Sequence, residues 1–187
     1  SMKRSFGAKP IIFPLPVLLI GTYDSSGRAN LMTASWGGIV NSTPPMISVS
    51  VRRERHTHAA LTANSEFTIS IPQTSRAGEA DYCGIYSNAN SDKVTELGLN
   101  PYQSETINAP IFPEFPITLL CRVSQTVELG THTMFVSEIL DFQADESVIV
   151  DGELSIERID PLFYDTISKF YYNIGTKVKK AYSEPKR

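Results

Sequence analysis

Short segments in which bulky apolar residues alternate with small or polar ones dominate this sequence, and turn-forming residues separate them. The clearest pair is residues 17–23 and 28–36, which flank the run Asp24-Ser25-Ser26-Gly27, a signal for a β-hairpin. A side-chain period of two is that of a strand. Later segments have the same character, and we expect strands at residues 39–41, 46–51, 65–72, 117–125 and 134–142, and a short strand with a turn at residues 147–154.

This pattern predicts a mainly β fold, an antiparallel β-barrel with helical additions. It does not favour a parallel, doubly wound sheet, and the sequence contains neither GxGxxG nor a GxxxxGKS/T phosphate loop. The helical patterns are short: residues 57–63, with Thr57 as the expected N-cap, and residues 76–82 and 93–97. The last two lie in a polar insertion over residues 73–108, which we expect to be a lid or a partner surface.

Length and composition fit a single domain over residues 1–187. The chain has 187 residues, of which 41% are hydrophobic and 20% charged, enough to bury a sizeable core. Its C-terminal part, residues 161–187, is rich in Phe and Tyr before it becomes basic. Because this is too much aromatic area for a free tail, we expect the segment to dock on the body or on a second subunit.

Charge and cysteine usage exclude several classes of protein. A net charge of −3 leaves no overall electrostatic attraction for nucleic acid. The apolar run Val17-Leu18-Leu19-Ile20 is far shorter than the roughly 20 residues of a membrane-spanning helix. The two cysteines, Cys83 and Cys121, form no CxxC motif. We therefore expect a cytoplasmic protein with free thiols and without nucleic-acid or membrane partners.

Small residues at the end of the second predicted strand are candidates for contact with a flat polar ring. Thr33, Ala34 and Ser35 leave backbone N–H and C=O groups accessible, and Trp36 could form a pocket wall. The alternative is an ordinary strand end followed by a core tryptophan. On the strand at residues 46–51, Ser50 lies on a serine-lined face that suits hydroxyl contacts, or is simply solvated.

A cationic segment follows that strand and suits a phosphate. It contains Arg52, Arg53 and Arg55, and then His56-Thr57 where the first helix is expected to begin. Guanidinium groups and the N–H groups of a helix N-terminus are good phosphate ligands. The alternative is a solvated charged surface. A zinc or iron site is disfavoured because no acid or thiol accompanies the histidines at ligand spacing.

Two further positions in the insertion have both a functional and an ordinary interpretation. Cys83 could be a nucleophile, or a small apolar filler beside a close backbone approach at Gly84. Lys93 could bring a second cation to a phosphate, although such a lysine is usually solvated. No Ser-His-Asp arrangement or carboxylate pair is evident.

Taken together, these residues resemble the flavin reductase-like family with an FMN-binding split barrel, and within it the flavoredoxin branch. The resemblance covers nearly the whole chain in the expected order. Its pieces are residues 30–36, 44–52, 56–57, 67–72, 81–84, 92–93, 130–136 and 171–175. One departure is Thr131, where the family commonly has an acid before the histidine, and this removes support for a role of His132.

The resemblance implies an antiparallel Greek-key split barrel and a homodimer that binds FMN near the interface. It places Thr33 to Trp36 and Ser50-Val51-Arg52 along the isoalloxazine and ribityl groups. It further assigns the phosphate to His56, Thr57 and Lys93, and puts Cys83-Gly84 near the ring.

The activity implied by the resemblance is electron transfer through bound FMN, with no residue acting as general acid or base. The donor would be NAD(P)H or a redox protein, and the acceptor a flavin, a metal complex or a redox protein. The alternative is a non-catalytic module that binds or senses FMN.

Overall fold

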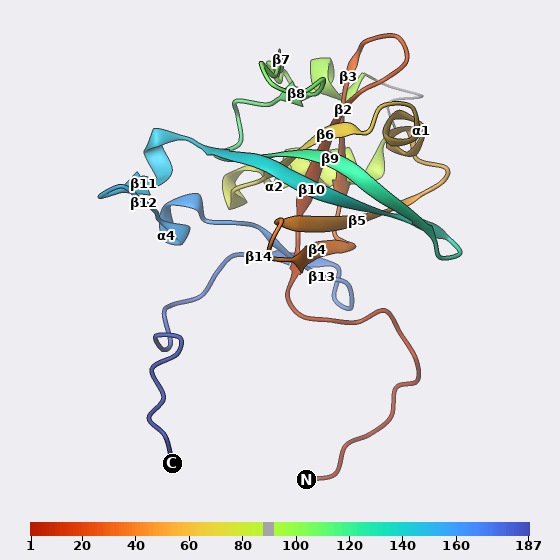
Figure 1. Cartoon of the computed structure of the whole chain (residues 1–187). Helices are drawn as coiled ribbons and strands as arrows, with labels where there is room; N and C mark the ends of the chain where they lie inside the picture. The colour runs from red at the N-terminus through yellow and green to blue at the C-terminus, as the bar shows by residue number, and fades with distance from the viewer. Residues whose placement is uncertain (88–91) are drawn as a thin grey trace.

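A computed structural model describes residues 1–87 and 92–187. Its centre is a seven-stranded antiparallel sheet in the order β3-β2-β6-β9-β10-β5-β4, as Figure 1 shows. The strands are β2 (Leu18–Tyr23), β3 (Ala29–Ala34), β4 (Gly37–Asn41), β5 (Met46–Arg52), β6 (Glu66–Ile71), β9 (Ile117–Glu128) and β10 (His132–Ala144). The expected mainly β class is therefore confirmed.

The predicted hairpin forms, and a second hairpin follows it. β2 pairs with β3 from Leu18↔Ala34 to Tyr23↔Ala29, and β4 pairs with β5. The Asp24 carboxylate closes the first turn by accepting from the backbone N–H of Ser26 at 2.9 Å and of Arg28 at 3.0 Å. These bonds hold the chain at the point where its direction reverses.

The sheet curls into a barrel that is left open between its two edge strands, β3 and β4. Where the chain passes from one to the other, the Trp36 carbonyl accepts from the Ser50 N–H at 2.8 Å. Gly37 is needed here, since a Cβ on it would lie 2.7 Å from the Ser48 carbonyl oxygen. The ends of β3 and β5 are thus held side by side at the opening.

Apolar residues pack on both faces of β2. Leu18 and Ile20 point into the barrel, where they join Val49, Phe67 and Phe135. The alternate residue Leu19 belongs to a second cluster outside the barrel, together with Leu31, Cys83, Phe112 and Leu162. This second cluster attaches the helical additions to the barrel.

The first helix, α1 (His56–Ala63), is where the sequence predicted it, but its predicted N-cap is wrong. The capping position is Arg55, which has an extended backbone and makes no side-chain cap bond. Thr57 is buried instead, and its hydroxyl accepts from the Asn30 amide on β3 at 2.7 Å. The Thr57 hydroxyl, which local sequence rules assigned to helix capping, therefore makes a tertiary hydrogen bond instead.

The insertion holds short elements that pack beside β3. These are the 3-10 turn η1 (Thr74–Arg76), α2 (Ala77–Ile85), α3 (Lys93–Glu96) and β7 (Tyr102–Gln103). The two helices contact β3, whereas β7 pairs with β8 (Pro110–Ile111), which follows the insertion and contacts β2 and β6. The Asp92 side chain caps α3 by accepting from the Thr95 N–H at 3.3 Å. Both helices of the insertion agree with the predicted ranges.

The chain after β10 adds small elements around the barrel. They are η2 (Glu146–Val148), β11 (Ile149–Val150), β12 (Glu153–Leu154), α4 (Ile156–Ile159), β13 (Phe163–Asp165) and β14 (Phe170–Tyr172). β13 and β14 form a three-stranded sheet with β1 (Leu15–Pro16). Residues 1–14 and 175–187 are exposed, and both ends of the chain extend from the same side of the body (Figure 1).

Within the described ranges, no helix combines the length and the apolar character that a membrane crossing requires.

Candidate functional site

A cavity of about 470 Å³ lies at the opening of the barrel. Its inner surface is formed by the ends of two strands: Thr33 and Ala34 of β3 with the following Ser35, and Ser50, Val51 and Arg52 of β5. The Thr33 hydroxyl donates to the Ala80 carbonyl on α2. This bond ties the floor of the cavity to the insertion.

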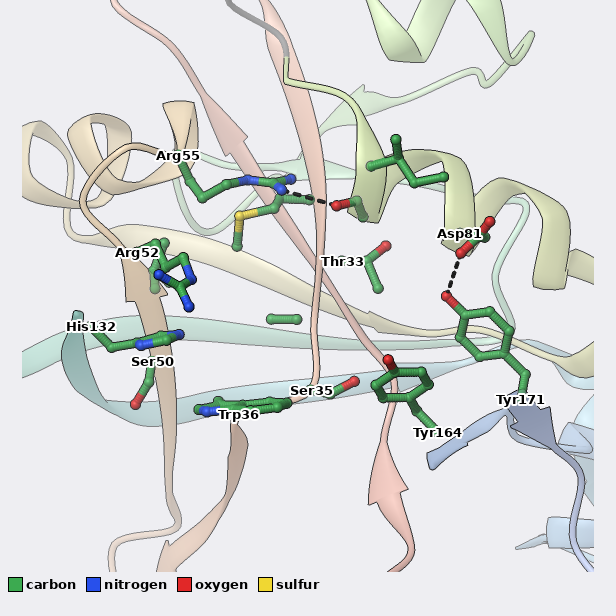
Figure 2. Close-up of a pocket in the computed structure, with 15 residues that line it drawn as sticks. Thr33, Ser35, Trp36, Ser50, Arg52, Arg55, Asp81, His132, Tyr164 and Tyr171 are labelled. Carbon is green, nitrogen blue, oxygen red and sulfur yellow. Dashed lines mark hydrogen bonds between the residues drawn. The ribbon is translucent and has the colours of Figure 1, made fainter. Parts of the chain in front are cut away.

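An indole and an imidazole form one aromatic wall. Trp36 and His132 are stacked, with ring centroids 6.3 Å apart and an angle of 7° between their planes (Figure 2). Burial lowers the pKa of His132, and the nearby Arg52 cation lowers it further against the opposing effect of Glu54. The imidazole is therefore mostly neutral at pH 7, with a flat face available beside the cavity.

Two tyrosines from the C-terminal sheet form the opposite wall, as Figure 2 shows. Tyr164 and Tyr171 have their ring centroids 5.4 Å apart. The Tyr171 hydroxyl donates to the Asp81 carboxylate on α2 at 2.8 Å. Burial raises the pKa of Tyr171, and the Asp81 bond adds to this, so the phenol stays protonated at neutral pH.

Arg55 lines the cavity and binds the C-terminal end of α2. Its guanidinium donates to the Gly84 carbonyl at 3.0 Å and to the Cys83 carbonyl at 3.1 Å. A cation is favourable at this end of a helix. Partial burial nevertheless lowers the pKa of Arg55, because it removes part of the water that stabilises the charged form.

A second cation, Lys93, lies behind the cavity and is only 1% exposed. Its ammonium donates to the same Cys83 carbonyl at 3.4 Å. Burial lowers the pKa of Lys93 to about 8; the Cys83 thiol opposes this shift and Arg55 adds to it. Across residues 1–87 and 92–187, neither cation forms an ion pair with a carboxylate.

The cavity therefore combines flat aromatic walls, accessible backbone and hydroxyl groups, and positive charge that carboxylates do not balance. Such a site suits a planar, polar ring that carries an anionic group. In the described residues, no group of three or more His, Cys, Asp or Glu side chains is placed to hold a metal ion.

Comparison with known proteins assigns the chain to a family. The family model for the flavin reductase like domain matches residues 11–170. The chain belongs to the flavin reductase-like family. A relative with a named activity is the reductase component of 4-nitrophenol 4-monooxygenase/4-nitrocatechol 2-monooxygenase from Rhodococcus opacus. It is 32% identical over 102 residues, which cover 54% of this chain and 51% of that protein.

Two solved structures place the chain in the flavoredoxin branch of this family. Flavoredoxin of Desulfovibrio vulgaris (Miyazaki F) superposes with a TM-score of 0.92 at 42% identity, over 97% of this chain and 98% of that one. Flavoredoxin from Methanosarcina acetivorans gives a TM-score of 0.91 at 30% identity, over 98% and 97%. The split-barrel fold and the resemblance found in the sequence are both confirmed.

Most of the site residues predicted for this flavin reductase-like chain line the cavity. They are Thr33, Ala34, Ser35, Trp36, Ser50, Val51, Arg52 and Gly84. Sequence reasoning assigned no site role to Asp81, Tyr164 or Tyr171, and it left His132 without one. The aromatic richness of residues 161–172 was the available signal, but it predicted docking and not a cavity wall.

The other four predicted residues, His56, Thr57, Cys83 and Lys93, do not line the cavity. The His56 imidazole donates to the Asp24 carboxylate at 3.2 Å and faces a second hollow of about 560 Å³. The Thr57 hydroxyl is bound by Asn30. Cys83 is fully buried, and burial raises the pKa of its thiol to about 11, so it is poorly suited to be a nucleophile.

Proposed function

We propose that the cavity binds FMN and that the protein transfers electrons between NAD(P)H or a redox protein and a flavin, a metal complex or a redox-protein acceptor. The observation that carries this proposal is the pair Arg55 and Lys93, a half-buried and a buried cation at an aromatic cavity, neither of which has a carboxylate partner among the described residues. Family membership and the likeness to flavoredoxins support it.

The residues present fit such a ligand in size and in chemistry. A cavity of about 470 Å³ is within the range of roughly 300 to 1,000 Å³ typical of small-molecule sites. The ring system would lie between the Trp36–His132 wall and the tyrosines, with its polar edge toward the ends of β3 and β5. A phosphate would compensate the charge of Arg55 and Lys93, whose burial is otherwise unfavourable.

His56 and Thr57 enter this proposal through their backbone. The side chain of His56 is bound to Asp24 and that of Thr57 to Asn30. The His58 N–H is already bound to the Arg55 carbonyl at 3.0 Å, whereas the N–H groups of His56 and Thr57 precede the first bonds of the helix, and a phosphate could accept from them. This replaces the side-chain contacts that the sequence suggested.

Bound FMN would supply the hydride and electron-transfer chemistry, while the protein would orient the ring and set its electrostatic surroundings. Arg52 brings a positive charge to the cavity edge, which favours negative charge acquired there on reduction. The stacked Trp36 and His132 exclude water from one face. No side chain is assigned as a general acid or base.

We further propose that the protein is a homodimer, formed in part by the exposed edge strand β4. Ile39 and Val40 on this strand are 68% and 52% exposed. A long apolar edge in water is a liability that association removes. Because β4 follows Trp36 directly, a partner on this edge would lie close to the cavity.

An anaerobic reduction assay tests the proposed function. The purified protein is titrated with FMN, freed of excess ligand, and mixed with NADH or NADPH while flavin absorbance is followed. Loss of the yellow colour supports a nicotinamide-linked reductase. Colour that persists with both, but bleaches with a reduced ferredoxin, supports a protein-fed carrier. Colour that no donor bleaches favours the alternative, a sensing or storage module, and failure to retain FMN overturns the whole proposal.

A further inference from the structure

Basic residues are concentrated near the two ends of this sequence and acidic residues in the part between them. Residues 1–14 and 173–187, called here the terminal arms, contain eight of the 17 Lys and Arg residues and one of the 20 Asp and Glu residues. The remaining body, residues 15–172, contains nine cations and 19 acids, a net charge of −10. The overall net charge of −3 therefore conceals a basic pair of arms and an acidic body.

The terminal arms carry apolar side chains as well as charge, and the structure gives these little to contact. Phe6 is 70% exposed, and Val178 and Tyr182 are fully in solvent. In the described parts of the chain, the ion pairs of the arms stay within the arms: Lys179 and Arg187 each pair with Glu184. At their inner ends the arms line a hollow together with body residues such as Phe163 and Tyr172. Beyond those ends they present exposed basic and apolar side chains, a composition suited to bind another surface.

A complementary surface exists at the far end of β10 and the elements that follow it. Residues 138–157, called here the acidic lobe, contain seven acids and no Lys or Arg. In the described structure none of the seven forms an ion pair. The lobe also exposes apolar side chains, among them Phe142 at 53%, Leu154 at 45% and Ile156 at 51%. Acidic and apolar groups thus lie together here, as basic and apolar groups do on the arms.

We propose that the terminal arms of one copy of this chain dock on the acidic lobe of a second copy. This rests on the homodimer proposed above and adds the surface that holds it together. Opposite charges attract across the contact, and the exposed apolar side chains of both parts leave water.

A second copy is the favoured occupant for two reasons. The acidic, apolar surface that matches the arms belongs to this same chain. In addition, both arms leave the body from one side and extend away from it, as Figure 1 shows. Fourteen extended residues span roughly 45 Å, about the diameter of a body of this size. An arm is therefore long enough to cross a neighbouring copy.

Docking in this way would also act on the cavity. The N-terminal arm leads into β1 and the C-terminal arm leaves β14, and both strands belong to the sheet that carries Tyr164 and Tyr171. An arm held by the partner would restrain this sheet, and with it the tyrosine wall.

Isotope-mixed crosslinking tests the contact in the unaltered protein. Equal amounts of ¹⁵N-labelled and unlabelled protein are mixed, treated with a carbodiimide that joins amines to neighbouring carboxylates, and digested for mass spectrometry. We expect crosslinks between arm lysines and lobe acids in which one peptide is labelled and the other is not. Arm-to-lobe crosslinks found only within one chain, or none at all, would overturn the proposal.

Charge reversal in trans provides the second test. An arm variant, Lys177→Glu with Lys180→Glu, and a lobe variant, Glu146→Lys with Glu153→Lys, are each expected to raise the dimer dissociation constant at least tenfold in sedimentation. Mixed together, they should associate with the affinity of the unaltered protein, because each supplies what the other lacks. Glu105→Lys, the same change at an exposed glutamate outside the lobe, is the control and should have no effect.

The outcomes separate this inference from the proposals on which it rests. If the variants dimerise as tightly as the parent, the arms do not contribute to the interface, and the homodimer proposal itself is unaffected. A mixture that fails to recover association would also count against docking in trans. FMN binding and bleaching by nicotinamides are measured independently and do not decide the question.

Discussion

Two clusters of charge lie near the N-terminal end of α1, one around His56 and the other around the preceding Arg55, and they differ in how they are balanced. At the first, the Asp24 carboxylate accepts from the backbone of Ser26 and Arg28 and from the His56 imidazole. At the second, Arg55 and Lys93 share carbonyl groups at the end of α2, and no carboxylate in the described structure pairs with them. In the described structure the first cluster contains its own counter-charge, whereas the second contains only cations and carbonyl groups.

The pKa values record this difference. Burial works to raise the pKa of Asp24, but hydrogen bonds from Ser26, Arg28 and His56 outweigh it and lower the value to about 2. The pKa of Lys93 falls to about 8 because burial dominates and Arg55 adds to it. A shift toward the charged form marks a group that stabilises the fold, and a shift away from it marks a group whose charge costs stability. Only the second kind suggests a binding site.

Replacement of Lys93 by Met should give the largest effect. The folded-state pKa lies below the ordinary value of 10.5. The destabilisation is therefore complete below pH 8 and is lost as the pH rises toward 10.5. We expect Lys93→Met to raise the free energy of unfolding of the FMN-free protein by about 3 kcal/mol at pH 7, while weakening FMN binding by on the order of 1 to 3 kcal/mol.

Urea unfolding with and without FMN measures both quantities. Lys169→Met, at an exposed lysine of the β13–β14 turn, is the matched control and should change neither. A Lys93→Met protein that is less stable than the parent without FMN would show that the ammonium is already compensated within the chain.

Asp24→Asn should have the opposite combination of effects. The folded-state pKa of Asp24 is depressed, so the carboxylate contributes stability above its unfolded pKa and loses that contribution as the pH falls toward 2. Because solvent in the neighbouring hollow screens the group, we expect a loss of on the order of 1 to 2 kcal/mol at pH 7. The difference in the free energy of unfolding between the parent and Asp24→Asn should decrease as the pH falls from 4 to about 2.

FMN affinity should remain as in the parent, which a fluorescence titration checks. Equal losses of affinity and stability would mean that the two clusters act as one.

The pH dependence of ligand binding provides a third test. Above pH 8 a growing fraction of Lys93 is neutral in the free protein, and a bound phosphate would require it to take up a proton. We therefore expect FMN affinity to fall by up to about tenfold per pH unit above 8. Riboflavin, which has no phosphate, should bind with a constant affinity over the same range. Parallel curves for the two ligands would remove Lys93 from the phosphate site.

The balanced cluster was more accessible to sequence reasoning than the unbalanced one. Asp24 and Gly27 mark a turn by local rules, and the strands on each side follow from alternation, so the hairpin was predicted correctly. Lys93 was named as a second cation, yet its burial could not be derived, because an isolated lysine is usually solvated. What buries it is the packing of α3 against β3, a contact between segments far apart in the sequence.

The difference between local patterns and contacts of distant segments also explains which site residues were predicted wrongly or missed. Thr57 has the composition of an N-cap, but Asn30, 27 positions earlier, takes its hydroxyl. Trp36 and Ser50 lie at strand ends that a hairpin pattern can place. Tyr171 reaches the cavity only because β14 joins a sheet with β1 at the other end of the chain. Short-range patterns therefore predicted the site residues on the barrel strands, whereas the tyrosine wall was evident only from the structure.

A substitution in the tyrosine wall should have the smallest effect on stability and FMN binding, because the carboxylate that Tyr171 binds is open to solvent. Asp81 is exposed and can be rehydrated when the Tyr171 hydroxyl is removed. We expect Tyr171→Phe to lower the free energy of unfolding by about 0.5 to 1 kcal/mol and to change FMN affinity less than Lys93→Met does. Tyr172→Phe, at the exposed neighbouring residue of the same strand, is the control for urea unfolding and FMN titration. A Tyr171→Phe effect as large as that of Lys93→Met would mean that the ligand depends on the outer wall as much as on the cations, and the contrast between the two clusters would no longer locate the site.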